Sequence, residues 1–183
     1  DAPRPALWSQ PVRPLLALAA AHPAPICEHV GQRVKPSIEL YTDGACKKTG
    51  EGGWGYVLRV TASGKELEGS GGITGTTSQR MELTAALGGL QRLECPCVVR
   101  LVSDSQYLVK GLTMWAKMWE RDGWRKAGGD PVLNRDLWVS LLFQSRRHEV
   151  TAEWVRGHSG HPENERCDKL ATAASRALNV VAH

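Results

Sequence analysis

Four carboxylates occupy positions where the surrounding residues predict little contact with solvent. Asp43 and Asp104 each follow a run of apolar and β-branched residues, so each ends a predicted strand, where ligands of open α/β sheets commonly bind. Glu82 shares one line of a predicted helix with small and apolar residues, where a charge is rare. Asp168 lies in the first turns of the last predicted helix. Taken singly, these acids have plainer explanations as turn formers, helix caps or partners of a helix dipole.

Taken together, the four acids predict one polar crevice. Carboxylates held close together repel one another unless cations lie between them. A set of hard oxygen ligands without Cys or His suits Mg²⁺, with Mn²⁺ as a substitute. Mg²⁺ shares phosphate oxygens, so a phosphate ester is the expected substrate, and two ions ~3.5–4 Å apart would serve the attacking and leaving oxygens.

The elements that position these acids follow from the hydrophobic pattern. Short links containing Gly and Ser join the first three strands, and a nearly all-apolar fourth strand is typical of a buried parallel one. The pattern predicts an α/β fold with a mixed sheet covered by helices on both faces. In chain order it predicts strands over 38–42, 54–60 and 66–74, a helix over 78–93, a strand over 98–102, helices over 105–112, 115–119 and 131–143, a strand over 149–155 and a helix over 162–178.

Composition is that of a globular domain with a tail. The chain has 183 residues, 42% of them apolar, and a net charge of +4, a mild basic excess that permits nucleic acid as a partner. Its longest clean apolar run, Leu15–Ala21, is far shorter than the ~20 residues that span a bilayer, so we expect no membrane segment. Residues 1–36 are rich in Pro and Ala and lack periodicity, which predicts a poorly ordered extension before a domain at 37–183. A signal or transit segment is the alternative for this extension.

Four motifs in order resemble those of type 1 ribonuclease H, the bacterial-type ribonuclease HI family. They are Thr-Asp-Gly-Ala-Cys at 42–46, Thr-Thr-Ser-Gln-Arg-Met-Glu-Leu at 76–83, Ser-Asp-Ser-Gln-Tyr at 103–107, and Gly-His-Ser-Gly-His-Pro-Glu-Asn-Glu-Arg-Cys-Asp at 157–168. The resemblance covers about 37–178 and implies the ribonuclease H-like fold, with a five-stranded mixed sheet. It also implies endonucleolytic hydrolysis of the RNA strand of an RNA–DNA hybrid with two Mg²⁺ ions, leaving 5′-phosphate and 3′-hydroxyl ends.

The family's catalytic groups map onto five residues of this chain. Asp43, Glu82, Asp104 and Asp168 fall on its metal-binding acids. His158 falls on a loop histidine that assists proton transfer and product departure, and flanking glycines would let that loop move. A zinc site at the His-x-x-His of residues 158–161 is the weaker alternative, because no second ligand pair lies nearby.

The family's substrate contacts map onto three groups. The backbone of Gly44, Ala45 and Cys46 and the side chains of Ser78, Gln79 and Gln106 fall where the family faces the minor groove and the 2′-hydroxyl. The family often has Asn at positions 78 and 79. Candidates for the DNA strand are Thr77, Arg80 and Asn134, with helix capping and a surface ion pair as alternatives.

A Trp-rich basic segment over 110–126 resembles the family's protrusion that grips the DNA strand. In it Trp115 and Trp124 are candidate contacts, whereas Trp119 and Trp138 are expected to pack in the core. Glu120 and Asp122 lower its positive charge, which predicts a modest salt dependence of hybrid binding. We expect a cytoplasmic monomer, or an organelle-matrix protein if the extension is a transit segment. The alternatives are a non-catalytic nucleic-acid-binding module and a retroelement-derived or transposase-like nuclease.

Overall fold

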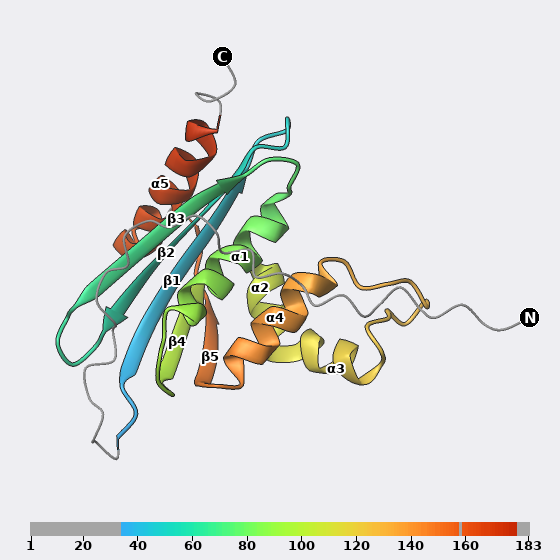
Figure 1. Cartoon of the computed structure of the whole chain (residues 1–183), viewed down its shortest axis with the longest axis horizontal. Helices are drawn as coiled ribbons and strands as arrows, with labels where there is room; N and C mark the ends of the chain where they lie inside the picture. Colours follow the sequence, from blue (N-terminus) through green and yellow to red (C-terminus); the bar gives the residue numbers. More distant parts are fainter. Residues whose placement is uncertain (1–33, 158, 179–183) are drawn as a thin grey trace, which may run out of the picture.

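A five-stranded mixed sheet with the strand order β3-β2-β1-β4-β5 organises the fold (Figure 1). Strands β1, β2 and β3 form an antiparallel meander, and β4 and β5 run parallel to β1. The computed structural model describes residues 34–157 and 159–178. Its elements are β1 (Ser37–Cys46), β2 (Gly52–Val60), β3 (Glu66–Ile73), α1 (Ser78–Gln91), β4 (Val98–Ser103), α2 (Gln106–Lys110), the π-helical turn η1 (Gly111–Trp115), α3 (Ala116–Arg121), α4 (Arg135–Ser145), β5 (Glu149–Trp154) and α5 (Pro162–Ala177).

Helices cover both faces of the sheet, as the sequence predicts. Alternate residues of a strand point to opposite faces, and in β1 this places Leu40 with α1 and Tyr41 with α5. The face carrying α1 and α4 holds the larger core, which includes the fully buried Trp138. Helix α5 packs alone across the meander on the other face (Figure 1). Of the two tryptophans predicted to pack in the core, Trp138 is buried in it and Trp119 is partly buried against it.

The predicted elements are confirmed, with three local differences. Helix α4 begins at Arg135, four residues after the predicted start at 131, and Pro131 instead pairs with Arg125 in an isolated β-bridge. Strand β1 continues to Cys46, because the antiparallel pairing with β2 extends four residues beyond the predicted end. The two helices predicted over 105–112 and 115–119 form one continuous helical run, interrupted only by the π-helical turn η1. Gly111 opens this turn, and a Cβ there would lie 2.0 Å from the ring of Trp138, so packing against α4 excludes a side chain.

The folded domain begins slightly before the predicted boundary. The Pro36 carbonyl accepts a hydrogen bond from the Val98 N–H, and the Lys35 ammonium pairs with Glu149 at 2.6 Å. Residues 35 and 36 therefore contact the sheet just before the central strand β1, and residues 1–33 of the predicted extension lie outside the described residues. None of the helices in the described ranges is both long and apolar enough to cross a membrane.

Candidate active site

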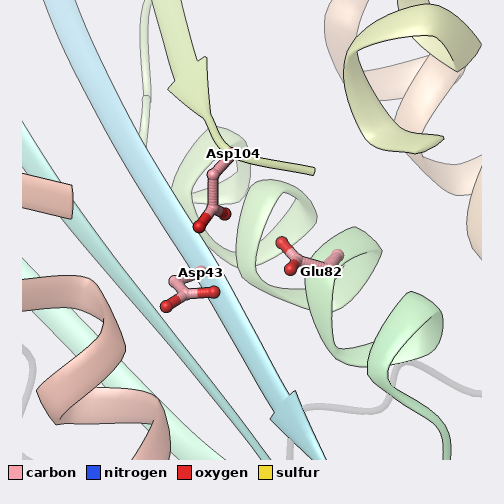
Figure 2. Close-up of side chains that lie close together, drawn as sticks. All are labelled: Asp43, Glu82 and Asp104. Atoms are coloured by element: carbon pink, nitrogen blue, oxygen red, sulfur yellow. The ribbon is translucent and has the colours of Figure 1, made fainter. Parts of the chain in front are cut away.

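Three of the four predicted acids converge. Asp43 of β1, Glu82 of α1 and Asp104 at the end of β4 each offer a carboxylate oxygen, and these oxygens lie within 4.8 Å of one another. The carboxylates of Glu82 and Asp104 are turned toward Asp43, where the end of β4 and helix α1 meet β1 (Figure 2). The prediction of one shared crevice is thus met by three acids that are up to 61 positions apart in the chain.

The backbone sets this convergence. The parallel pairing of β1 with β4 ends at Thr42 and Ser103, so Asp43 and Asp104 are the first residues after it on their two strands. Gly44 then lies directly against α1, and a Cβ at this position would be 2.3 Å from the Glu82 nitrogen. The absence of a side chain at Gly44 lets β1 approach the first turns of α1 and brings Asp43 opposite Glu82.

Burial and mutual repulsion perturb Glu82 strongly. Desolvation, followed by the charges of Asp43 and Asp104, raises the pKa of Glu82 to about 9, while the Gly44 backbone N–H acts in the opposite direction. The Glu82 Oε2 atom is buried without a hydrogen-bond partner. A cation would satisfy this oxygen and remove the repulsion, so the residues present fit a divalent ion with oxygen ligands.

Asp168 lies on α5, outside the group of three. A Cβ at Gly55, the β2 partner of Asp43, would be 2.8 Å from the Cys167 carbonyl oxygen, so this turn of α5 lies over the strand pair that carries Asp43. Burial, followed by the charge of Asp43, raises the pKa of the buried Cys167 thiol. The Asp168 Oδ1 atom accepts a hydrogen bond of 3.3 Å from Thr172. Helix α5 thus brings Asp168 to the margin of the cluster rather than into its centre.

Ion pairs fix the first turns of α5 on the sheet. Arg59 of β2 contacts Glu163 at 2.7 Å, and Arg166 contacts Glu66 of β3 at 2.6 Å. These half-buried pairs tie the start of α5 to two strands, because a displacement of the helix would break both pairs. They hold the segment that carries Asp168 and follows the glycine-containing loop.

The loop with the predicted histidine starts beside the cluster. His158 itself lies outside the described residues, but the preceding Gly157 is so close to Asp104 that a Cβ would be 2.4 Å from its Oδ2 atom. Trp154 also donates a hydrogen bond of 2.8 Å from its indole nitrogen to the Asp104 carbonyl. Both contacts anchor the start of the loop to the residue that contributes one of the three carboxylates.

The residues predicted to contact substrate at the start of α1 lie on the surface. Thr77 caps α1, its hydroxyl accepting from the Arg80 N–H at 3.3 Å, so the capping alternative holds for this residue. Ser78 and Gln79 follow it and are exposed. Arg80 forms a surface ion pair, which was the alternative to DNA contact for this residue. Its two terminal guanidinium nitrogens donate to the Asp136 carboxylate at 3.0 and 2.7 Å.

Asn134 has an unusual backbone for its position. It precedes α4 in the left-handed region (φ 57°), and its side chain makes no cap hydrogen bond, so the capping alternative fails. Instead its amide accepts from Arg80 and donates to the Tyr107 hydroxyl, each at 3.4 Å. The indole N–H of Trp138 also donates to that hydroxyl at 2.9 Å. Sequence reasoning missed Tyr107, because nothing around an isolated Tyr marks it as a hydrogen-bonding centre.

The other predicted contacts divide by exposure. Gly44, Ala45 and Cys46 are half-buried along the end of β1, and Gln106 is exposed on α2. Trp115 is half-buried, whereas Trp124 is only 8% exposed and belongs to the larger core. Arg135 lies over the Trp124 ring at 6.0 Å. The burial of Trp124 favours packing over direct substrate contact.

Comparison with known proteins identifies the family to which this chain is similar. The family model described as RNase H matches residues 35–176. Ribonuclease H of Geotalea uraniireducens is 54% identical over 138 residues, which cover 75% of this chain and 92% of that protein. Ribonuclease H of Pseudomonas syringae is 50% identical over 148 residues, covering 80% and 97%.

Solved structures agree with this match. LC9-RNase H1, a type 1 RNase H with the type 2 active-site motif, aligns with a TM-score of 0.71 at 27% identity, covering 80% of this chain and 75% of that chain. A foamy viral protease–reverse transcriptase in complex with an RNA/DNA hybrid shares the fold, with a TM-score of 0.65 at 17% identity over 89% of this chain and 24% of that chain. The extent of the family match and the identity to its bacterial relatives show that this chain belongs to the ribonuclease H family.

Proposed function

We propose that this chain is an endoribonuclease that hydrolyses the RNA strand of RNA–DNA hybrids, with two Mg²⁺ ions held by Asp43, Glu82, Asp104 and Asp168. The observation that carries the proposal is the convergence of three carboxylates, one with a buried and unpartnered oxygen, in a member of this family. When bound, such ions supply Lewis-acid activation of water and charge neutralisation on the phosphate. The relatives at about 50% identity are named ribonuclease H, which supports the hybrid as substrate.

The protein's own residues have separable tasks. Asp43, Glu82 and Asp104 hold the cations at a spacing that the backbone fixes, and Asp168 completes the ligand set from α5. His158 takes up and releases protons during the reaction, because an imidazole is the side chain suited to proton transfer at neutral pH. The preceding Gly157 lies against Asp104. Attack by water on the phosphorus leaves a 5′-phosphate and a 3′-hydroxyl, without participation of the neighbouring 2′-hydroxyl.

The remaining surface residues position the hybrid. The backbone of Gly44, Ala45 and Cys46 faces the 2′-hydroxyl groups of the RNA strand, together with the side chains of Ser78, Gln79 and Gln106. Thr77, Arg80, Asn134 and Trp115 contact the DNA strand. The hydrogen bonds that hold the Asn134 side chain support this role, because a pre-oriented amide loses little entropy when it binds. We further propose a monomer that acts in the cytoplasm.

One experiment tests this function directly. The protein is incubated with labelled RNA–DNA hybrid, double-stranded RNA or double-stranded DNA, in Mg²⁺ or in EDTA, and the products are resolved on a gel. We expect cleavage of the hybrid's RNA strand alone, only with Mg²⁺. Asp43→Asn is expected to abolish this cleavage and retain hybrid binding, and Asp130→Asn, an exposed acid in the 126–131 turn, is the control that keeps full activity.

Three results would contradict the proposal. Cleavage in EDTA would remove the role of the metal ions. A 2′,3′-cyclic phosphate product would assign the attack to the 2′-hydroxyl. Tight hybrid binding without cleavage in Mg²⁺ or Mn²⁺ would favour the non-catalytic binding module.

A further inference from the structure

A hollow of about 260 Å³ lies between α2 and the end of β5 and is lined by Gln106, Val109, Lys110 and Trp154. We call it the α2 hollow. Three of the four lining residues have no assignment in the function proposed above: Val109, Trp154 and Lys110, the first residue of the basic segment 110–126. Its walls combine a cation, an amide and an aromatic face, which is a set of groups that suits a sugar–phosphate unit.

The α2 hollow adjoins the carboxylate cluster. Trp154, which lines it, donates its indole N–H to the carbonyl of Asp104 at 2.8 Å. Gln106, which also lines it, follows Asp104 by two residues in the chain. The hollow therefore lies beside the residue that contributes one of the three carboxylates.

Lys110 is available to an anion. Its ammonium group donates one hydrogen bond, of 2.9 Å, to the Gln106 side-chain oxygen, and it forms no ion pair with an acid among residues 34–157 and 159–178. By contrast, Arg121 is paired with Asp122, and Arg146 with Glu120. An exposed lysine without an acidic partner keeps its full charge for a phosphate, because none of it is neutralised locally.

Trp154 supplies the second element of the hollow. Its side chain is 45% exposed although its nitrogen is bound to the backbone. The hydrogen bond fixes the plane of the ring, so the exposed indole face is a rigid surface on which a ribose can pack. Trp154 is the last residue of β5, so the fold of this strand does not require its side chain to be exposed.

From this geometry we infer that the α2 hollow binds a phosphate of the strand that is cleaved, adjacent to the scissile one, with Lys110 as its cation and Trp154 as its sugar platform. The inference rests on the proposed function for the position of the scissile phosphate. The cleaved strand is assigned because the hollow adjoins Asp104. Arg80 and Asn134, two of the groups proposed for the DNA strand, do not line the hollow and contact each other instead.

The test measures hybrid binding in EDTA, so that its readout is independent of cleavage. Lys110→Gln is expected to weaken binding roughly fivefold to tenfold and to lower the slope of log Kd against log salt by about one. Lys110→Arg is expected to restore most of both. Lys65→Gln is the matched control, because Lys65 lies in the turn between β2 and β3, outside every segment proposed to contact the hybrid.

A neutral linkage identifies the strand. A 2′-O-methyl methylphosphonate is moved along the RNA strand and compared with the same 2′-O-methyl nucleotide carrying an ordinary phosphodiester. One position is expected to weaken binding by wild type, with no further loss in Lys110→Gln. The inference is overturned if Lys110→Gln binds with the wild-type slope, or if the matching position is found only in the DNA strand. Failure of the proposed function is distinct, because it appears as absence of Mg²⁺-dependent cleavage by the wild-type protein.

Discussion

Replacing Glu82 by glutamine is expected to stabilise the metal-free protein, although it removes a proposed metal ligand. In the folded protein, burial and the nearby Asp43 and Asp104 raise the pKa of Glu82 from 4.5 to about 9. The folded protein therefore keeps this proton over a range in which the unfolded chain has released it. The contribution of Glu82 to the free energy of unfolding is complete below pH 4.5 and is lost progressively as the pH rises to 9.

The size of the effect follows from these two pKa values. In the unfolded chain Glu82 has the ordinary Glu pKa of 4.5, so pH 7.5 lies three units above it. Each unit corresponds to about 1.4 kcal/mol. Wild type is thus about 4 kcal/mol less stable at pH 7.5 than at pH 4.5 through this group alone. Glutamine resembles the protonated acid at every pH and avoids this loss. For a domain of this size the difference corresponds to a melting temperature higher by roughly 10 °C.

Thermal unfolding in EDTA at pH 4.5 and pH 7.5 measures the effect. Glu82→Gln and wild type are expected to melt together at pH 4.5 and to separate at pH 7.5, with the variant the more stable. Glu94→Gln, an exposed acid outside the cluster, is the control and is expected to follow wild type at both pH values. Equal melting of Glu82→Gln and wild type at pH 7.5 would refute the electrostatic account of the site.

Three further predictions concern activity. Asp168→Asn is expected to raise the Mg²⁺ concentration for half-maximal rate about tenfold, because Asp168 lies at the margin of the cluster; complete loss at saturating Mg²⁺ would give it a central role instead. His158→Ala is expected to lower kcat about 100-fold without abolishing turnover. A wild-type rate that stays constant from pH 6 to 9 would show that the histidine is passive. Substituting both Glu120 and Asp122 by Lys is expected to steepen the salt dependence of hybrid binding, because in the wild-type protein each of these acids pairs with an arginine. Equal slopes of log Kd against log salt for variant and wild type would refute a role for this segment in the grip on DNA.

The order of strands and helices could be predicted because the hydrophobic period changes where the elements change. The convergence of Asp43 with Asp104 could also be anticipated, since the ends of neighbouring parallel strands meet at one edge of a sheet. Glu82 was recognisable as a charge on an otherwise apolar line of its helix.

Other features depend on contacts between distant segments and left little local signal. The left-handed backbone of Asn134 is held by Arg80 and Tyr107, which lie 54 and 27 positions away. Trp124 resembled a surface aromatic because basic residues surround it in sequence, yet tertiary packing buries its ring. The π-helical turn at Gly111 reflects the fit against Trp138, which no spacing within the segment reveals.

Because Gly44 packs closely against α1, the main chain sets the distance between β1 and α1 at the site. Two backbones in van der Waals contact cannot move nearer, and a methyl group between them would force them apart. Adaptation to an ion of different radius must therefore come from exchanging Asp and Glu, which changes reach by one methylene, while the scaffold stays constant.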